Sequence, residues 1–124
     1  MSATKPVKTA PNFVELVLTC GSWQEAQRIV DHLLEQKLIA CAKFLPIEYK
    51  SWLYGELGTV KEVKLFMESL ADKFEQIESE VAALHSYTTF VLQSVPIMQV
   101  SSGAAAWVQY ITGQSDLTNS ETER

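Results

Sequence analysis

The spacing of hydrophobic residues changes several times along this 124-residue chain, and these changes constrain its fold more than any other feature. Residues 13–18 (FVELVL) form a nearly continuous apolar run, which is typical of a central β-strand. The run stops at Cys20-Gly21, and Ser22 then precedes Glu25 by three residues, the spacing of a capping box at the start of a helix. That helix is predicted by apolar residues that share one face: Ala26, Ile29, Val30, Leu33 and Leu34.

A long hairpin is predicted next. Residues 38–54 and 60–67 indicate its two strands, and Gly55 and Gly58 are expected to bracket the turn between them. Pro46 predicts an edge position for the first of these strands, because proline has no N–H to donate to a neighbour.

The last third of the chain predicts three further elements. Asp72 and Glu75 are spaced to cap a second helix, which has an apolar face of Phe74, Ile77, Val81 and Leu84. Residues 90–95 indicate a strand that Pro96 closes, and the Ala-rich residues 103–111 indicate a short terminal helix.

The predicted order is therefore β-α-β-β-α-β with a small extra helix. This is the α+β, ferredoxin-like split β-α-β plan, with one antiparallel sheet, two helices on one face, and the first and third strands in the centre. We expect a sheet that is apolar on both faces, and nothing in the chain is left to cover the face away from the helices. We therefore expect a second subunit there, in a closed homo-oligomer.

The two ends of the chain differ from the middle in composition. Residues 1–11 and 112–124 are rich in polar residues and have little apolar surface to bury. We expect a flexible N-terminal tail at 1–11, a single domain at 12–111 and a flexible C-terminal tail at 112–124. The start of the chain also lacks the apolar run of a secretion signal.

Charge and composition exclude several classes of partner. Ten Lys and Arg residues against fifteen Asp and Glu residues give a net charge of −5, so neither nucleic acid nor an anionic membrane is expected to bind. No apolar run approaches the roughly 18 residues of a membrane span. The chain has only two cysteines, too few for the disulfide framework of a small secreted protein, and we expect a cytoplasmic location.

Few residues indicate chemistry by themselves. The sequence contains no phosphate-binding loop, nucleophile elbow or paired-cysteine zinc motif, so no enzyme is predicted. Cys20 and Cys41 are read first as small buried hydrophobic residues, with metal ligation or redox chemistry as the alternative. His85 follows the second helix, where it could bind a metal or cap the carbonyl end of the helix.

Several short strings resemble the CutA family of divalent-cation-tolerance proteins. They are spread between residues 14 and 111, over almost the whole predicted domain: LTC at 18–20, AQ at 26–27, KLIAC at 37–41, FLP at 44–46, Gly55, EV at 62–63, LH at 84–85 with Tyr87, VPI at 95–97, and Trp107. The resemblance implies a ferredoxin-like subunit in a tight homotrimer, with the long hairpin reaching over the neighbouring subunit. It also implies a non-enzymatic role in binding or tolerating divalent metal ions, copper above all.

The resemblance also suggests site residues. His85, Cys41 and Cys20 are the candidate metal ligands. The candidate residues of a cleft between subunits are Trp52, Tyr54 and Tyr87. No cofactor is expected other than copper or another divalent metal.

The chain departs from the family pattern around this cleft, at Leu53, Tyr54, Ser86, Phe90 and Val91. One of these changes removes a carboxylate, which favours a less cationic ligand. The alternative function is therefore a small-molecule sensor or signalling module that uses clefts between subunits, as the trimers of PII proteins do. A third possibility is an interaction protein whose C-terminal tail recruits partners.

Overall fold

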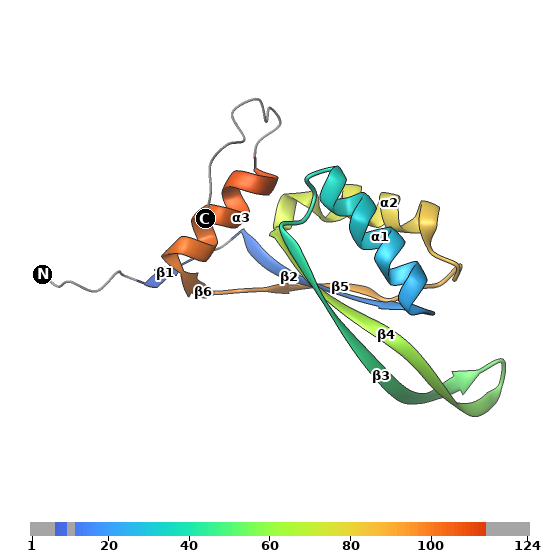
Figure 1. Cartoon of the computed structure of the whole chain (residues 1–124). Helices are drawn as coiled ribbons and strands as arrows, with labels where there is room; N and C mark the ends of the chain where they lie inside the picture. Colours follow the sequence, from blue (N-terminus) through green and yellow to red (C-terminus); the bar gives the residue numbers. More distant parts are fainter. Residues whose placement is uncertain (1–6, 10–11, 114–124) are drawn as a thin grey trace, which may run out of the picture.

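Six elements build the main sheet and its two helices. The computed structural model describes residues 7–9 and 12–113. The six elements are β2 (Phe13–Cys20), α1 (Trp23–Glu35), β3 (Cys41–Leu53), β4 (Glu56–Leu70), α2 (Phe74–Leu84) and β5 (Leu92–Pro96). The strands are antiparallel in the order β3-β4-β2-β5, with α1 and α2 together on one face (Figure 1). The predicted split β-α-β plan is confirmed, with β2 and β4 in the centre.

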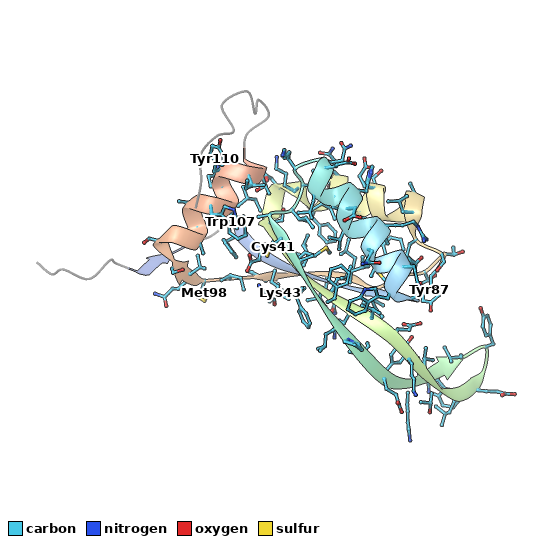
Figure 2. All side chains as sticks on the ribbon, viewed as in Figure 1. Cys41, Lys43, Tyr87, Met98, Trp107 and Tyr110 are labelled. Carbon is cyan, nitrogen blue, oxygen red and sulfur yellow. The ribbon has the colours of Figure 1, made fainter. Side chains whose placement is uncertain are left out.

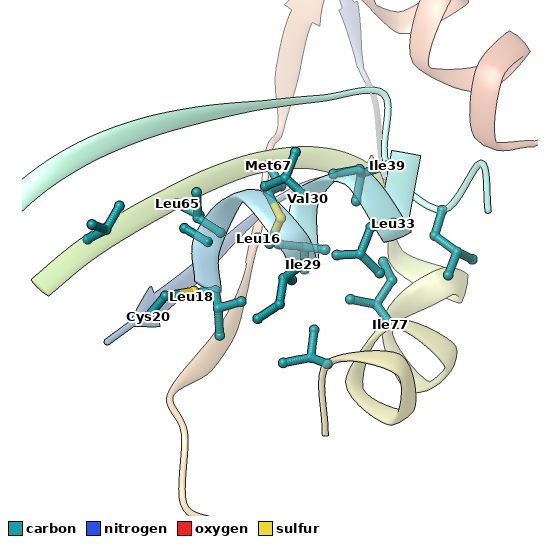
Figure 3. Close-up of a cluster of buried hydrophobic side chains, with 14 of the residues drawn as sticks. Leu16, Leu18, Cys20, Ile29, Val30, Leu33, Ile39, Leu65, Met67 and Ile77 are labelled. Atoms are coloured by element: carbon teal, nitrogen blue, oxygen red, sulfur yellow. The ribbon is translucent and has the colours of Figure 1, made fainter. Parts of the chain in front are cut away.

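The hydrophobic core lies between the two helices and the sheet (Figure 3). Strand residues alternate between the two faces, so Leu16 and Leu18 of β2 point to the same side as their partners Met67 and Leu65 of β4. Helix residues from the predicted faces meet them, and the buried ones are Ala26, Ile29, Val30, Leu33, Ile77 and Val81.

The two helices begin differently. Ser22 caps α1, since its Oγ accepts a hydrogen bond from the Glu25 N–H at 3.1 Å. Helix α2 is preceded by the 3₁₀ turn η1 (Ala71–Lys73), so its N-cap is Lys73, which makes no capping hydrogen bond from its side chain. The predicted cap at Asp72 is therefore wrong, because the chain is already turning when it reaches that residue.

Strand β4 is longer than predicted, strand β3 is shorter, and the turn between them is tighter. Strands β3 and β4 pair from Cys41 opposite Glu68 to Leu53 opposite Glu56, which leaves only Tyr54 and Gly55 for the turn. Both turn residues have positive φ, 51° and 86°. Two such residues match the twist of paired strands. Gly58 lies within β4 and does not bound the turn, so that part of the prediction is wrong.

Two boundary predictions differ from the structure. Residues 7–9 of the predicted N-terminal tail form strand β1 (Val7–Thr9), which pairs with β6 (Gln99–Ser101). Thr112, expected in the C-terminal tail, is the buried last residue of α3 (Ser102–Thr112). Neither contact can be read from local composition, because each depends on distant chain or helix packing. The remaining tail residues, 1–6, 10–11 and 114–124, lie outside the described part of the chain.

The sheet face that points away from α1 and α2 is only partly apolar. Val17 is buried there, but Leu45 and Val95 are 49% and 42% exposed and lie among charged residues such as Lys64. The expectation of a sheet that is apolar on both faces is therefore met only in part. At one end of the sheet, Val108 of α3 packs against Phe13 and Leu70. Among the described residues, no helix has both the length and the apolar character needed to span a membrane.

Candidate metal site

Three side chains that metals favour as ligands meet where β2 ends. Cys20 is the last residue of β2, Glu25 lies in the first turn of α1, and His85 directly follows α2. The Cys20 Sγ, a carboxylate oxygen of Glu25 and a ring nitrogen of His85 all lie within 4.8 Å of one another. The side chains of Glu25 and His85 are 4% and 0% exposed, and Cys20 is also buried. The fold thus brings two of the predicted ligands together and adds a third.

Hydrogen bonds hold His85 in one orientation. Its Nε2 lies 2.8 Å from the carbonyl oxygen of Thr19, which can only accept, so Nε2 carries the proton. Its Nδ1 accepts a hydrogen bond from the Tyr87 N–H at 3.0 Å and lies 3.7 Å from the Glu25 Oε2. The ring also stacks on Phe90, with 5.2 Å between ring centroids.

Glu25 links the helix start to the segment after α2. Its Oε1 accepts from the Gly21 N–H at 2.8 Å, and its Oε2 accepts from the Ser86 N–H. Burial of the carboxyl acts to raise its pKa, but the hydrogen bonds from Gly21 and Ser86 outweigh burial and lower the pKa below its usual value of 4.5. Glu25 is therefore a buried carboxylate that stays ionised.

Sequence reasoning used Glu25 only as half of a capping box. In a capping box, the Glu25 carboxylate would accept a hydrogen bond from the Ser22 N–H. In the structure it accepts one from the Gly21 N–H instead, while Ser22 Oγ still accepts from the Glu25 N–H. A signal for its inward position was present: Glu25 precedes Ile29 by four residues and Leu33 by eight, so it shares their buried face.

Cys20 is a protonated thiol in this environment. Burial is the main cause that raises its pKa to about 12, and the nearby carboxylates of Glu25 and Glu62 raise it further. A cation bound beside Cys20 would lower the pKa of the thiol and favour the thiolate, which is the form that binds metals. Thiolate, imidazole and carboxylate together suit copper or zinc, so these residues fit such an ion.

A second carboxylate lies beside this cluster. Glu62 of β4 is buried and accepts hydrogen bonds from two phenols, Tyr49 at 2.9 Å and Tyr87. The pKa of Tyr87 is raised chiefly by the hydrogen bond to Glu62, and that of Tyr49 chiefly by burial. Both phenols therefore stay protonated and act as donors.

A hollow of about 330 Å³ opens beside the cluster, lined by Gly21, Ser22, Glu25, Arg28, Ser86 and Tyr87.

The other predicted site residues lie elsewhere. Cys41 faces Glu68 at the start of β3, and its Sγ donates to the Glu68 Oε1 at 3.1 Å. Cys20 pairs with Val63, five residues from Glu68 along β4, which is roughly 17 Å at the usual strand rise. One ion within one subunit therefore cannot bind both cysteines. Figure 2 shows Cys41 and Lys43 well apart from Tyr87.

Of the three residues predicted for a cleft, only Tyr87 contacts this cluster within the subunit. Trp52 and Tyr54 lie at the far end of the hairpin, where Trp52 is 70% exposed and Tyr54 is fully exposed. The hairpin end projects well beyond the helices (Figure 1).

Comparison with known proteins gives one consistent family. Residues 14–110 match the family model described as CutA1 divalent ion tolerance protein. The divalent-cation tolerance protein CutA of Archaeoglobus fulgidus is 34% identical over 97 residues, which cover 78% of this chain and 93% of that protein. The protein of the same name from Thermus thermophilus is 27% identical over 100 residues, covering 79% and 96%.

Solved structures agree with this result. A structure described as the periplasmic divalent cation tolerance protein CutA from Archaeoglobus fulgidus superposes with a TM-score of 0.79 at 31% identity, covering 81% of this chain and 98% of that one. The divalent ion tolerance protein CutA1 from Ehrlichia chaffeensis gives a TM-score of 0.78 at 25% identity, covering 82% and 96%.

Proposed function

Because this chain belongs to the CutA1 family of divalent ion tolerance proteins, we propose that it binds a metal ion and serves in metal tolerance. The observation that carries this proposal is the convergence of Cys20, Glu25 and His85 within 4.8 Å. These three residues would hold the ion. By ligand softness and the usual order of affinities, copper is the metal expected to bind best.

The charges around the cluster support a cation as the ligand. Two buried carboxylates, Glu25 and Glu62, lie close enough to Cys20 for both to raise the pKa of its thiol. A bound cation supplies the positive charge that balances these carboxylates and the Cys20 thiolate.

A non-enzymatic role is part of the proposal. Cys20 and His85 are near each other, but a reactive cysteine needs a lowered thiol pKa and a base to take its proton. The Cys20 pKa is raised to about 12, and both ring nitrogens of His85 are already hydrogen-bonded, to Thr19 and Tyr87. The relatives, too, are named for tolerance rather than for a reaction, and their names give no support to the sensor alternative.

Titration calorimetry with Cu(II), Cu(I) and Zn(II) tests this function. We expect His85→Ala and Cys20→Ser to weaken binding by about 100-fold, because each removes one direct ligand. His32→Ala and Cys41→Ser are the matched controls and should bind as the native chain does, because both residues lie outside the cluster. Absent heat, or equal affinity of the native and His85→Ala proteins, would contradict the proposal.

The assembly we propose is a homotrimer. It would cover the partly exposed Leu45 and Val95 on the outer sheet face and the exposed Trp52 of the hairpin. Trp52 and Tyr54 would then line a cleft between subunits together with Tyr87. We also propose a cytoplasmic location, since a chain with only two cysteines has too few for the disulfide framework of a small secreted protein. Cell fractionation checks the location.

A further inference from the structure

The segment that follows α2 occupies the donor atoms of the candidate metal site. We propose that Ser86 and Tyr87, here called the strap, act as an internal competitor that must open before His85 can bind an ion. This inference rests on the proposed function and adds a control step to it.

Both nitrogens of the His85 ring are already hydrogen-bonded. A neutral imidazole has one N–H and one lone pair. The N–H is on Nε2, because Nε2 faces the carbonyl oxygen of Thr19 at 2.8 Å. The one lone pair is therefore on Nδ1, and the Tyr87 N–H occupies it at 3.0 Å. Nδ1 is also the nitrogen near Glu25, at 3.7 Å from Oε2. Metal ligation through Nδ1 thus requires the Tyr87 amide to leave.

The neighbouring amide of the strap covers a second donor. The Ser86 N–H donates to the Glu25 Oε2, the same oxygen that faces His85. Two successive backbone amides therefore point into the cluster and place partial positive charge where a cation would lie. The strap satisfies the buried donors when no ion is bound.

The side chain of Tyr87 holds the strap in place through a hydrogen bond to Glu62, here called the latch. Its hydroxyl donates to the Glu62 Oε2 on β4, so the strap is tied to the sheet as well as to the cluster. Gly21 leaves room for this contact, since a Cβ at that position would lie 3.1 Å from the Tyr87 hydroxyl oxygen. Ser86 and Tyr87 are exposed and line the hollow of about 330 Å³, so the strap borders solvent into which it can open.

Removing the latch should favour metal binding. Tyr87→Phe deletes only the hydroxyl, and Tyr49→Phe is its matched control because it deletes the other phenol on Glu62 without touching the strap. We expect Tyr87→Phe to bind Zn(II) about tenfold more tightly in calorimetry. In the native chain, opening the strap breaks the hydrogen bond from Tyr87 to the charged Glu62, and the variant has no such bond to break. Tyr49→Phe should bind as the native chain does. Gly21→Ala, which crowds the hydroxyl instead of deleting it, should also tighten binding.

Amide hydrogen exchange gives a second readout. Zn(II) should speed exchange at the amides of Ser86 and Tyr87, because they lose their acceptors, while core amides become better protected. Both phenylalanine variants should lower the melting temperature without metal. Tighter binding by Tyr87→Phe but not by Tyr49→Phe therefore separates release of the Tyr87–Glu62 hydrogen bond from general loosening.

The outcomes separate this inference from the proposed function. If the native chain binds Zn(II) through His85 and Tyr87→Phe binds no more tightly, the proposal that the strap competes with the ion is refuted, and the proposed metal site is retained. Slower exchange at Ser86 and Tyr87 on binding would refute it as well. If neither the native chain nor the variants bind, the site and the strap are both refuted.

Discussion

At the scale of single residues, Glu25 contributes to both stability and the candidate site. Its buried carboxylate accepts from Gly21 and Ser86 and faces His85 and Cys20. A carboxylate that satisfies several buried donors stabilises the fold, and it does so only while it is ionised.

This gives a prediction about pH. The folded-state pKa of Glu25 lies below 4.5, so its stabilisation is complete above pH 4.5 and is lost as the pH falls through the folded-state pKa. We expect Glu25→Gln to lower the free energy of unfolding by about 1–3 kcal/mol at neutral pH. The difference from the native chain should shrink at acid pH, as measured by urea unfolding at both conditions. If the native and Glu25→Gln proteins differ in stability by the same amount at neutral and acid pH, the role assigned to the Glu25 charge is wrong.

Cys20 gives a second prediction at this scale. Its thiol is buried and has a pKa of about 12, so almost no thiolate exists at neutral pH. In a Cys41→Ala variant without metal, iodoacetamide should leave Cys20 unmodified in the folded protein and modify it fully in denaturant. Mass spectrometry measures both states, and rapid modification of the folded protein would show that Cys20 is accessible.

At the scale of elements, the β3–β4 turn shows how backbone geometry selects residues. Two residues in the left-handed region join the strands, and only the second is glycine. Tyr54 adopts φ 51° in spite of its side chain, which is fully exposed. Strain at this residue is tolerated because the two long strands on either side hold the turn.

Two glycines allow a matched test of this geometry. A Cβ at Gly55 or at Gly103 would meet nothing within 4 Å, but only Gly55 has positive φ, at 86°. Gly55→Ala should therefore destabilise the protein by about 1 kcal/mol through backbone strain. Gly103→Ala, in the first turn of α3, should be neutral or stabilise by up to about 1 kcal/mol. Thermal unfolding of both variants measures the contrast, and equal effects would show that φ is not the cause.

At the scale of the whole molecule, the proposed homotrimer depends on the outer sheet face. Leu45 lies there opposite Lys64, and it is 49% exposed in one chain. Leu34 is an exposed leucine of similar kind on α1, on the other side of the sheet.

The same substitution at these two leucines tests the trimer. Light scattering of the native chain should give three times the 13.9 kDa mass of one chain. Leu45→Glu should lower that mass, because it takes a charge into the subunit contact, while Lys64 supports the new carboxylate in the single chain. Leu34→Glu should keep the native mass. A native protein with the mass of one chain would refute the assembly.

Much of the fold could be predicted because its signals are local. The start of α1 follows from Ser22, and its buried face follows from the spacing of Ala26, Ile29 and Leu33. The prediction was wrong where contacts are distant, in the pairing of β1 with β6 and the burial of Thr112. It was also wrong at two local features, the helix cap at Asp72 and the turn at Gly58. Predicting the strand neighbours did not predict that Cys20 and Cys41 lie beside positions five residues apart on β4, Val63 and Glu68.

The amino-acid sequence by itself determined the order of the six elements of the main sheet and its helices, and the faces that these elements bury. These features depend on backbone periodicity and on interactions within a few residues, which every copy of the sequence carries. Only the tertiary structure decided that Glu25 joins Cys20 and His85, and that the Tyr87 amide occupies the lone pair of His85. Those contacts join β2, α1 and the end of α2, which are far apart in the sequence. They form only after these elements have packed against one another.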